Sequence, residues 1–357
     1  MPISAVDSLT PAFEHTKQQL FRPFRFTQWI KLAFVGMLAG EVGSGGGGGP
    51  NFNIPASSGS SNNHFAAGHF PPLPHIDPAL WIPLIIILAI TLPILWLVVL
   101  YISSRMRFIL FDSVVEKRCE ISRMWRARGV EALRCWVWQI IFGLCAFAGS
   151  IVLIGIPLMV VYLLGWLSPP RQHVLQLVLS GIAVFFLFMI YFVAIITIHV
   201  FTKDFVVPQM ALENVSAFEG WRRLLAMLRS EKLPYAGYAG MKIVLTLGVA
   251  FAIAFAGIIL VLILLIPVGG LGVAAVIIGK GAGLTWNVWT VTAAVVAGCI
   301  AVLFFIYVIA LISVPAIVFF PAYSMYFFAS RYPQLARVLY PPPPPLAPIT
   351  PAPQPAV

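Results

Sequence analysis

Five long apolar runs constrain the fold of this chain more than any other feature. About 20 consecutive apolar residues cross a bilayer as an α-helix, and each run reaches that length. The runs are Leu80–Ser104, Trp136–Trp166, Val174–Phe201, Met241–Ile266 and Val288–Phe320. Charged residues make up only 10% of the chain, against about 25% in soluble domains. The sequence therefore predicts an all-α membrane protein whose surface is largely covered by lipid.

The distribution of basic residues predicts one further span. Lys and Arg accumulate in short cytoplasmic loops. All of the 22 Lys and Arg residues except Arg171 and Lys280 fall in alternate segments between the runs. The segments 105–134 and 203–242 are the richest, and we expect both to be cytoplasmic. Five spans would break this alternation, so the count predicts six spans, in three hairpins.

The first of these six spans is the least regular. Its apolar part, Trp29–Gly40, is short and contains Lys31, so it has to extend over residues 24–42 to cross a bilayer. Both termini are then cytoplasmic, and Glu41 lies near an outer end. Residues 41–79, which begin with a glycine run, are expected to form a flexible periplasmic loop.

Weak internal similarity predicts three units. The residues around Trp125 resemble those around Trp221, and Ala12-Phe13-Glu14 matches Ala217-Phe218-Glu219. Each unit would be a short basic amphipathic helix followed by a membrane hairpin. The units are residues 1–104, 105–201 and 202–330. Chance similarity in a biased sequence is the alternative. A single membrane domain would cover residues 1–335, with a disordered Pro-rich tail at 336–357.

The best-defined amphipathic helix lies in the third unit. Ser216 and Glu219 have the spacing of a capping box, and Glu219 can pair with Arg223 at i, i+4. Apolar residues at helical spacing define one face: Phe218, Trp221, Leu225 and Leu228. This face either lies in the inner-leaflet interface or seals the cytoplasmic end of the bundle. Sealing is the favoured interpretation.

Motifs in this region carry a family resemblance. The residues Pro208, Glu213, Ser216 and Trp221-Arg222-Arg223 before a hairpin resemble a group of uncharacterised six-helix bacterial membrane proteins. That group is similar to the membrane domain of some glycerophosphodiester phosphodiesterases. The runs Leu20–Phe24 and Pro321–Tyr326 are similar to one branch of it, a domain of unknown function. The resemblance implies this architecture and a bacterial inner membrane, and it implies no activity.

The basic helices supply the candidate binding residues. Arginines beside an anionic leaflet attract lipid headgroups, and interfacial tryptophans anchor helices at that depth. The candidate headgroup contacts are Arg123, Arg126, Arg128, Arg222, Arg223 and Arg229, and the candidate anchors are Trp125 and Trp221. The alternative is that these arginines only set the topology. The net charge of +10 fits such a surface better than nucleic acid, which is not an expected partner.

The sequence contains no recognisable catalytic or cofactor motif. The glycine run Gly45–Gly49 precedes Pro50 rather than the Gly-Lys-Ser/Thr of a phosphate loop. His64, His69 and His75 have no compact metal-site spacing. We therefore expect no enzyme, no cofactor and no metal.

Three function classes remain open at this point. The middle of each clear span lacks Asp, Glu, Lys and Arg, which disfavours a proton relay or a polar pore. A membrane scaffold or lipid-interacting module is the first class. A transporter or channel for an apolar or amphipathic solute is the alternative, and an intramembrane enzyme is the third. The sequence leaves the oligomeric state open.

Overall fold

The structure is a computed structural model that describes residues 4–41, 78–166, 173–281 and 288–340. Every named element within these ranges is helical. In chain order they are α1 (Leu9–Phe21), α2 (Phe26–Ala39), α3 (Pro78–Val115), α4 (Ile121–Ala127), α5 (Gly129–Leu163), α6 (Val174–Phe201), a π-helical turn (Thr202–Val206), α7 (Val207–Glu213), α8 (Ala217–Ser230), α9 (Lys232–Gly281), α10 (Val288–Ile312), α11 (Val314–Ala329) and α12 (Pro333–Leu339). Most of the predicted loop at 41–79 and of the tail lies outside the described residues.

Five of these helices are long and apolar enough to cross a membrane. Their candidate spans are Ile85–Val115, Gly129–Leu163, Val174–Glu213, Lys232–Ile263 and Thr290–Ile312, with mean hydropathies between 2.5 and 3.0. They coincide with the five apolar runs of the sequence, so this part of the prediction is confirmed. Prolines inside two runs do not end the helices, because α5 continues past Pro157 and α9 past Pro267.

The sixth predicted span is only a short helix. Helix α2 has 14 residues, which rise about 21 Å at 1.5 Å per residue, and the hydrocarbon core is about 30 Å thick. The helix ends where Gly40 adopts a left-handed conformation with φ of 79°, a common helix terminator. By length, α2 therefore does not cross a bilayer on its own.

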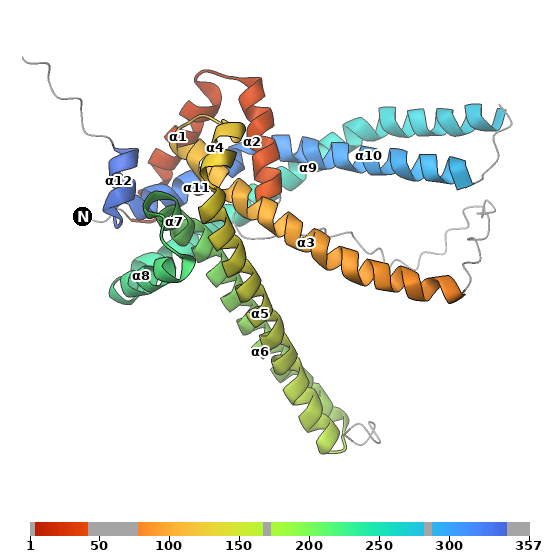
Figure 1. The fold of residues 1–357 in the computed structure, drawn as a ribbon, viewed down its shortest axis with the longest axis horizontal. Helices are drawn as coiled ribbons and strands as arrows, with labels where there is room; N and C mark the ends of the chain where they lie inside the picture. The colour runs from red at the N-terminus through yellow and green to blue at the C-terminus, as the bar shows by residue number, and fades with distance from the viewer. Residues whose placement is uncertain (1–3, 42–77, 167–172, 282–287, 341–357) are drawn as a thin grey trace, which may run out of the picture.

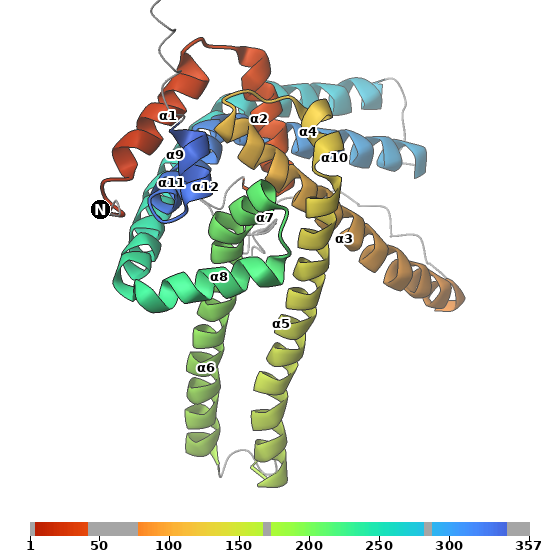
Figure 2. The same cartoon turned by 60° about the vertical axis from the view of Figure 1, so that its left-hand side comes forward.

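The molecule consists of a compact body from which long helical arms diverge (Figure 1). Helices α5 and α6 run side by side in one arm, α9 and α10 in another, and α3 extends separately in both views (Figures 1 and 2). The apolar windows of the arms are almost entirely exposed within the chain. Such large bare apolar surfaces require lipid or a partner to cover them.

Helix α11 forms the centre of the body. Its side chains are apolar and aromatic, and most of them are buried, including Phe320, Phe327 and Phe328. It packs against α1 near the N-terminus, where the Tyr323 hydroxyl donates a hydrogen bond of 3.1 Å to the Ala5 carbonyl. Helix α1 near the start of the chain and α11 near its end therefore lie on the same side of the arms.

Helix α8 confirms the predicted cap but buries a different face. The Ser216 hydroxyl accepts a hydrogen bond of 3.3 Å from the Glu219 backbone N–H. The buried positions are Ala217, Gly220 and Leu224, while Phe218 and Leu225 are exposed. Small residues allow close approach to the π-helical turn, so the larger apolar residues are left outside. Of the predicted apolar face, Trp221 and Leu228 pack against the core, and the exposed Phe218 contacts the Trp138 ring of α5 with centroids 4.9 Å apart.

Candidate functional site

A buried group of charged residues lies where the arms meet the body. Lys203 and Asp204 belong to the π-helical turn between α6 and α7. Such turns are rare, and they often occur at functional sites. The Lys203 side chain is 11% exposed and that of Asp204 only 2%. Burial of this kind costs several kcal/mol per charge unless each charge is paired. We call these two residues and their partners the ionic junction.

Asp204 is bound by two groups from α9. Lys242 forms an ion pair with the Asp204 carboxylate, and the Tyr238 hydroxyl donates a hydrogen bond of 2.9 Å to the same carboxylate. Tyr238 and Lys242 lie four residues apart, so they share one face of the helix. This arrangement joins the α5–α6 arm to the α9–α10 arm through one carboxylate.

Lys203 joins the same turn to the N-terminal helices. It pairs with Glu41, which follows directly after α2 and whose side chain is 3% exposed. The sequence analysis placed Glu41 and Lys203 on opposite sides of the membrane. Their ion pair shows that the two side chains are adjacent, so at least one of those placements is wrong. Span counting alone places Glu41, and it does not register this tertiary contact.

Arg107 of α3 completes the ionic junction. Its Nε donates a hydrogen bond of 3.4 Å to the Ala39 carbonyl at the end of α2, where the helix dipole favours a cation. Its Nη2 lies 3.4 Å from His199 Nε2. No carboxylate among the described residues pairs with Arg107, which is 9% exposed. Charged side chains from four parts of the chain therefore lie together: the residue after α2, helix α3, the turn between α6 and α7, and helix α9.

A small cavity of about 30 Å³ opens beside these charges. Its lining residues are Glu41, Arg107, Leu110, Phe111, Lys203, Asp204, Val207, Pro208, Pro321, Ser324 and Met325. A water molecule needs roughly 10–15 Å³ of such volume, so the cavity has room for about two or three waters. Its size suits hydration of the ionic junction rather than an organic substrate.

The contacts of the ionic junction are those of a structural site that holds helices together. Both carboxylates are occupied by lysines, and the described residues contain no group of three or more His, Cys, Asp or Glu that could hold a metal. His64, His69 and His75, for which the sequence predicts no metal site, lie outside the described residues. The sequence analysis missed the ionic junction, although Tyr238 and Lys242 at i, i+4 are a signal that could have indicated a shared carboxylate.

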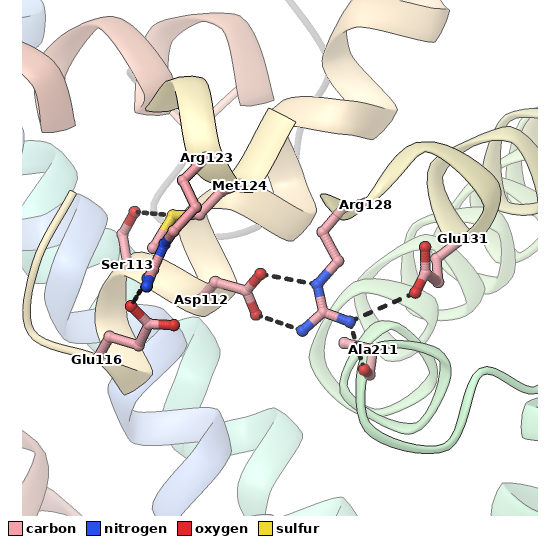
Figure 3. Close-up of polar contacts among 8 residues, drawn as sticks. All are labelled: Asp112, Ser113, Glu116, Arg123, Met124, Arg128, Glu131 and Ala211. Atoms are coloured by element: carbon pink, nitrogen blue, oxygen red, sulfur yellow. Dashed lines mark hydrogen bonds and ion pairs between the residues drawn. The ribbon is translucent and has the colours of Figure 1, made fainter. Parts of the chain in front are cut away.

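The structure places the predicted headgroup residue Arg128 inside the body (Figure 3). Its guanidinium binds Asp112 through two hydrogen bonds of 2.7 and 2.8 Å, and it donates a third of 2.6 Å to the Ala211 carbonyl. Hydrogen bonding to Asp112 raises the pKa of Arg128 above its ordinary value. Arg128 therefore ties α3 to α7 and does not face lipid headgroups.

Three more of the predicted arginines form ion pairs at the surface. Arg123 pairs with Glu116 and Glu120 on the loop before α4 (Figure 3). Arg222 and Arg223 both pair with Glu219, and hydrogen bonding to Arg223 holds the pKa of Glu219 below its ordinary value. These pairs leave less free positive charge than the sequence predicts.

The remaining two arginines have no carboxylate partner in the described part of the chain. Arg126 is exposed and contacts only Ser122 of its own helix, with hydrogen bonds at 3.5 Å. Arg229 is exposed near the end of α8 and makes no ion pair among the described residues. Of the six predicted headgroup contacts, these two keep their charge free for an external anion.

The two predicted anchors pack within the chain. The Arg105 guanidinium lies 4.3 Å from the centroid of the Trp125 ring, and the Trp221 indole donates a hydrogen bond of 3.1 Å to the Thr202 hydroxyl. Trp221 also lies beside Trp138 of α5, with ring centroids 6.3 Å apart. Both rings are half-buried, so packing accounts for much of their surface.

The five long apolar helices make this chain a multi-pass membrane protein of the all-α class. The chain belongs to DUF7544, a family of unknown function whose profile matches residues 3–338. No curated protein and no solved structure matches it. These comparisons agree with the predicted domain of unknown function and give no support for a relation to glycerophosphodiester phosphodiesterases.

Proposed function

We propose that this chain is a non-enzymatic scaffold or lipid-interacting module of a bacterial inner membrane. The observation that carries the proposal is the contrast between its two parts. The arms present bare apolar helices to their surroundings, while the body holds them through buried ion pairs at the ionic junction. A body that fixes diverging helices is suited to organising lipid or other membrane segments around them.

We further propose six crossings with both termini in the cytoplasm. The packing of α1 on α11 supports this topology, because both described ends of the chain then lie on one side of the membrane. The five candidate spans all have one end at the body, and α3 begins at its distant end. The alternation of basic segments along the sequence, which favours an even number of crossings, supports the sixth.

Lipid retention and binding partners test the proposed role. The protein is extracted in a mild detergent, and the purified sample is analysed by native mass spectrometry for bound lipids, proteins and small solutes. A scaffold or lipid module retains several lipids or a membrane protein partner. A single tightly held amphipathic solute, taken up by vesicles containing the protein but not by empty vesicles, would instead support the transporter alternative.

A further inference from the structure

The turn between α1 and α2 lies at the edge of the body (Figures 1 and 2), and it carries exposed aromatic and basic side chains. Phe21, Phe24 and Phe26 are 53%, 57% and 58% exposed, and Arg22 and Arg25 between them are exposed as well. These five residues are called the α1–α2 patch below. A single exposed phenylalanine is ordinary on a protein surface, but three within six residues form a contiguous apolar group.

The α1–α2 patch rests on a rigid support. The Trp29 ring contacts Phe21 and Phe24, with centroid distances of 5.9 and 5.7 Å. The Trp29 indole donates a hydrogen bond of 3.3 Å to the Leu20 carbonyl, and Phe21 and Phe24 are joined by an isolated antiparallel bridge. The outward position of these rings is therefore fixed by the turn.

The α1–α2 patch is attached directly to a membrane-spanning helix. The Tyr307 hydroxyl of α10, close to the end of its candidate span, donates a hydrogen bond of 3.4 Å to the Ile30 carbonyl of α2. Ile30 and Phe34 continue the apolar surface along α2, and they are 36% and 40% exposed. A surface fixed beside the end of a span lies close to the membrane interface.

The charges of the α1–α2 patch have no ionic partner in the described part of the chain. Arg22 and Arg25 make no ion pair among the described residues, and no Asp or Glu occurs between Glu14 and Glu41. Within the described ranges, every acidic side chain except Asp7 is already paired with Lys or Arg, as in Glu41, Asp112, Asp204, Glu213, Glu219 and Glu231. Within the described ranges a second copy of the chain therefore offers Asp7 as its one unpaired acidic side chain, which favours an anion from outside the chain, such as a lipid phosphate.

We propose that the α1–α2 patch inserts into the interface of an anionic bilayer. The phenylalanine rings would enter the boundary between headgroups and acyl chains, and Arg22 and Arg25 would contact lipid phosphates. This inference rests on the proposed membrane role and names the surface that selects the lipid. In this proposal Arg22 and Arg25 take the headgroup-binding role that the sequence predicts for the arginines of α4 and α8. Most of those arginines are paired within the chain.

A fluorescent reporter beside the α1–α2 patch tests this proposal. Thr27 is exposed at the start of α2, so Thr27→Cys carries an environment-sensitive NBD label without removing a phenylalanine. Cys145 and Cys299, which are exposed, are first replaced by Ala. The labelled protein is placed in nanodiscs of phosphatidylcholine alone or with 30% phosphatidylglycerol. We expect the emission to shift to the blue and strengthen with phosphatidylglycerol, and to lose most of this response in 0.5 M salt.

Two variants complete the design. The double variant R22Q/R25Q should lose most of the response to phosphatidylglycerol, because each basic residue near an anionic surface contributes about a fivefold preference. The matched variant R123Q/R222Q removes two exposed but paired arginines, and it should keep the emission response to phosphatidylglycerol. Equal emission in both kinds of nanodisc, or equal loss in both variants, would overturn the proposal. If the unlabelled protein were released from membranes by alkaline carbonate, the membrane role itself would fail instead.

Discussion

Lys203 and Glu41 form a buried ion pair although 162 residues separate them in the chain. The pair joins the end of α2 to the π-helical turn after α6, and Asp204 next to Lys203 reaches α9. Because each partner is buried, the contact cannot exchange freely for water without a cost of several kcal/mol. The ionic junction therefore joins the end of α2 to the body ends of two membrane-spanning helices, α6 and α9.

The Asp204–Lys242 pair should be more sensitive to removal of one charge than of both. The variant K242M leaves the Asp204 carboxylate buried beside Tyr238 without its cation, which should cost about 3–5 kcal/mol of folding free energy. The double variant D204N/K242M keeps an oxygen that accepts from Tyr238 and should recover most of this loss. Thermal melting in detergent measures the stability of the single and the double variant. A double variant as unstable as K242M would show that the charges do not act as a pair.

Arg128 should be essential for stability, whereas Arg126 should not. The variant R128Q removes two hydrogen bonds to Asp112 and one to Ala211, and it strands a buried carboxylate, so we expect a loss of about 3 kcal/mol or more. Arg126 is exposed and bonded only to Ser122, so R126Q should change stability by about 0.5 kcal/mol or less. Equal melting temperatures for the two variants would contradict this assignment.

His15 should make the protein less stable at mildly acidic pH. Burial lowers the pKa of His15 below its ordinary value of 6.5, while its ring contacts the Val114 carbonyl at 2.8 Å and the Tyr326 hydroxyl at 3.1 Å. On acidification the unfolded chain binds the proton first, so stability falls as pH drops below about 6.5. The variant H15Q should flatten the dependence of melting temperature on pH between 7 and 5. An unchanged slope in H15Q would assign the effect to other groups.

Gly36 should not tolerate a larger side chain. A Cβ atom at this position would lie 2.6 Å from two side-chain carbons of Ile317, so G36V should separate α2 from α11 and cost about 1–3 kcal/mol. Gly248 on α9 has no atom of the described chain within 4 Å of such a Cβ, and G248A provides the control. The ratio of monodisperse to aggregated protein after detergent extraction reports the difference. Similar behaviour of the two variants would argue against close packing of α2 on α11.

The five spans could be predicted from the sequence because apolar length alone defines them. The Ser216 cap could be predicted as well, because its signal lies within a few neighbouring residues. The pairing inside the ionic junction could not be predicted, since Glu41 reaches Lys203 and Asp204 reaches Lys242 only through tertiary packing. Pairing also explains why the sequence predicts that Arg128 binds a lipid headgroup. In the sequence, a basic residue at the end of a span has the same pattern whether or not a carboxylate lies near it in the fold. The short apolar part Trp29–Gly40 already indicates that α2 is short. The alternation of basic segments nevertheless favours a sixth span, because it depends on charge and not on length.

Site-directed labelling of cysteines tests the proposed membrane topology most directly. In a background with Cys145 and Cys299 replaced by Ala, single cysteines are introduced at Ser58 and at Ser216. Cells with a permeabilised outer membrane are treated with an impermeant maleimide before and after lysis. Six crossings predict that Ser58 reacts in whole cells and that Ser216 reacts only after lysis. Labelling of Ser216 in whole cells, or protection of Ser58 until lysis, would contradict the proposed topology.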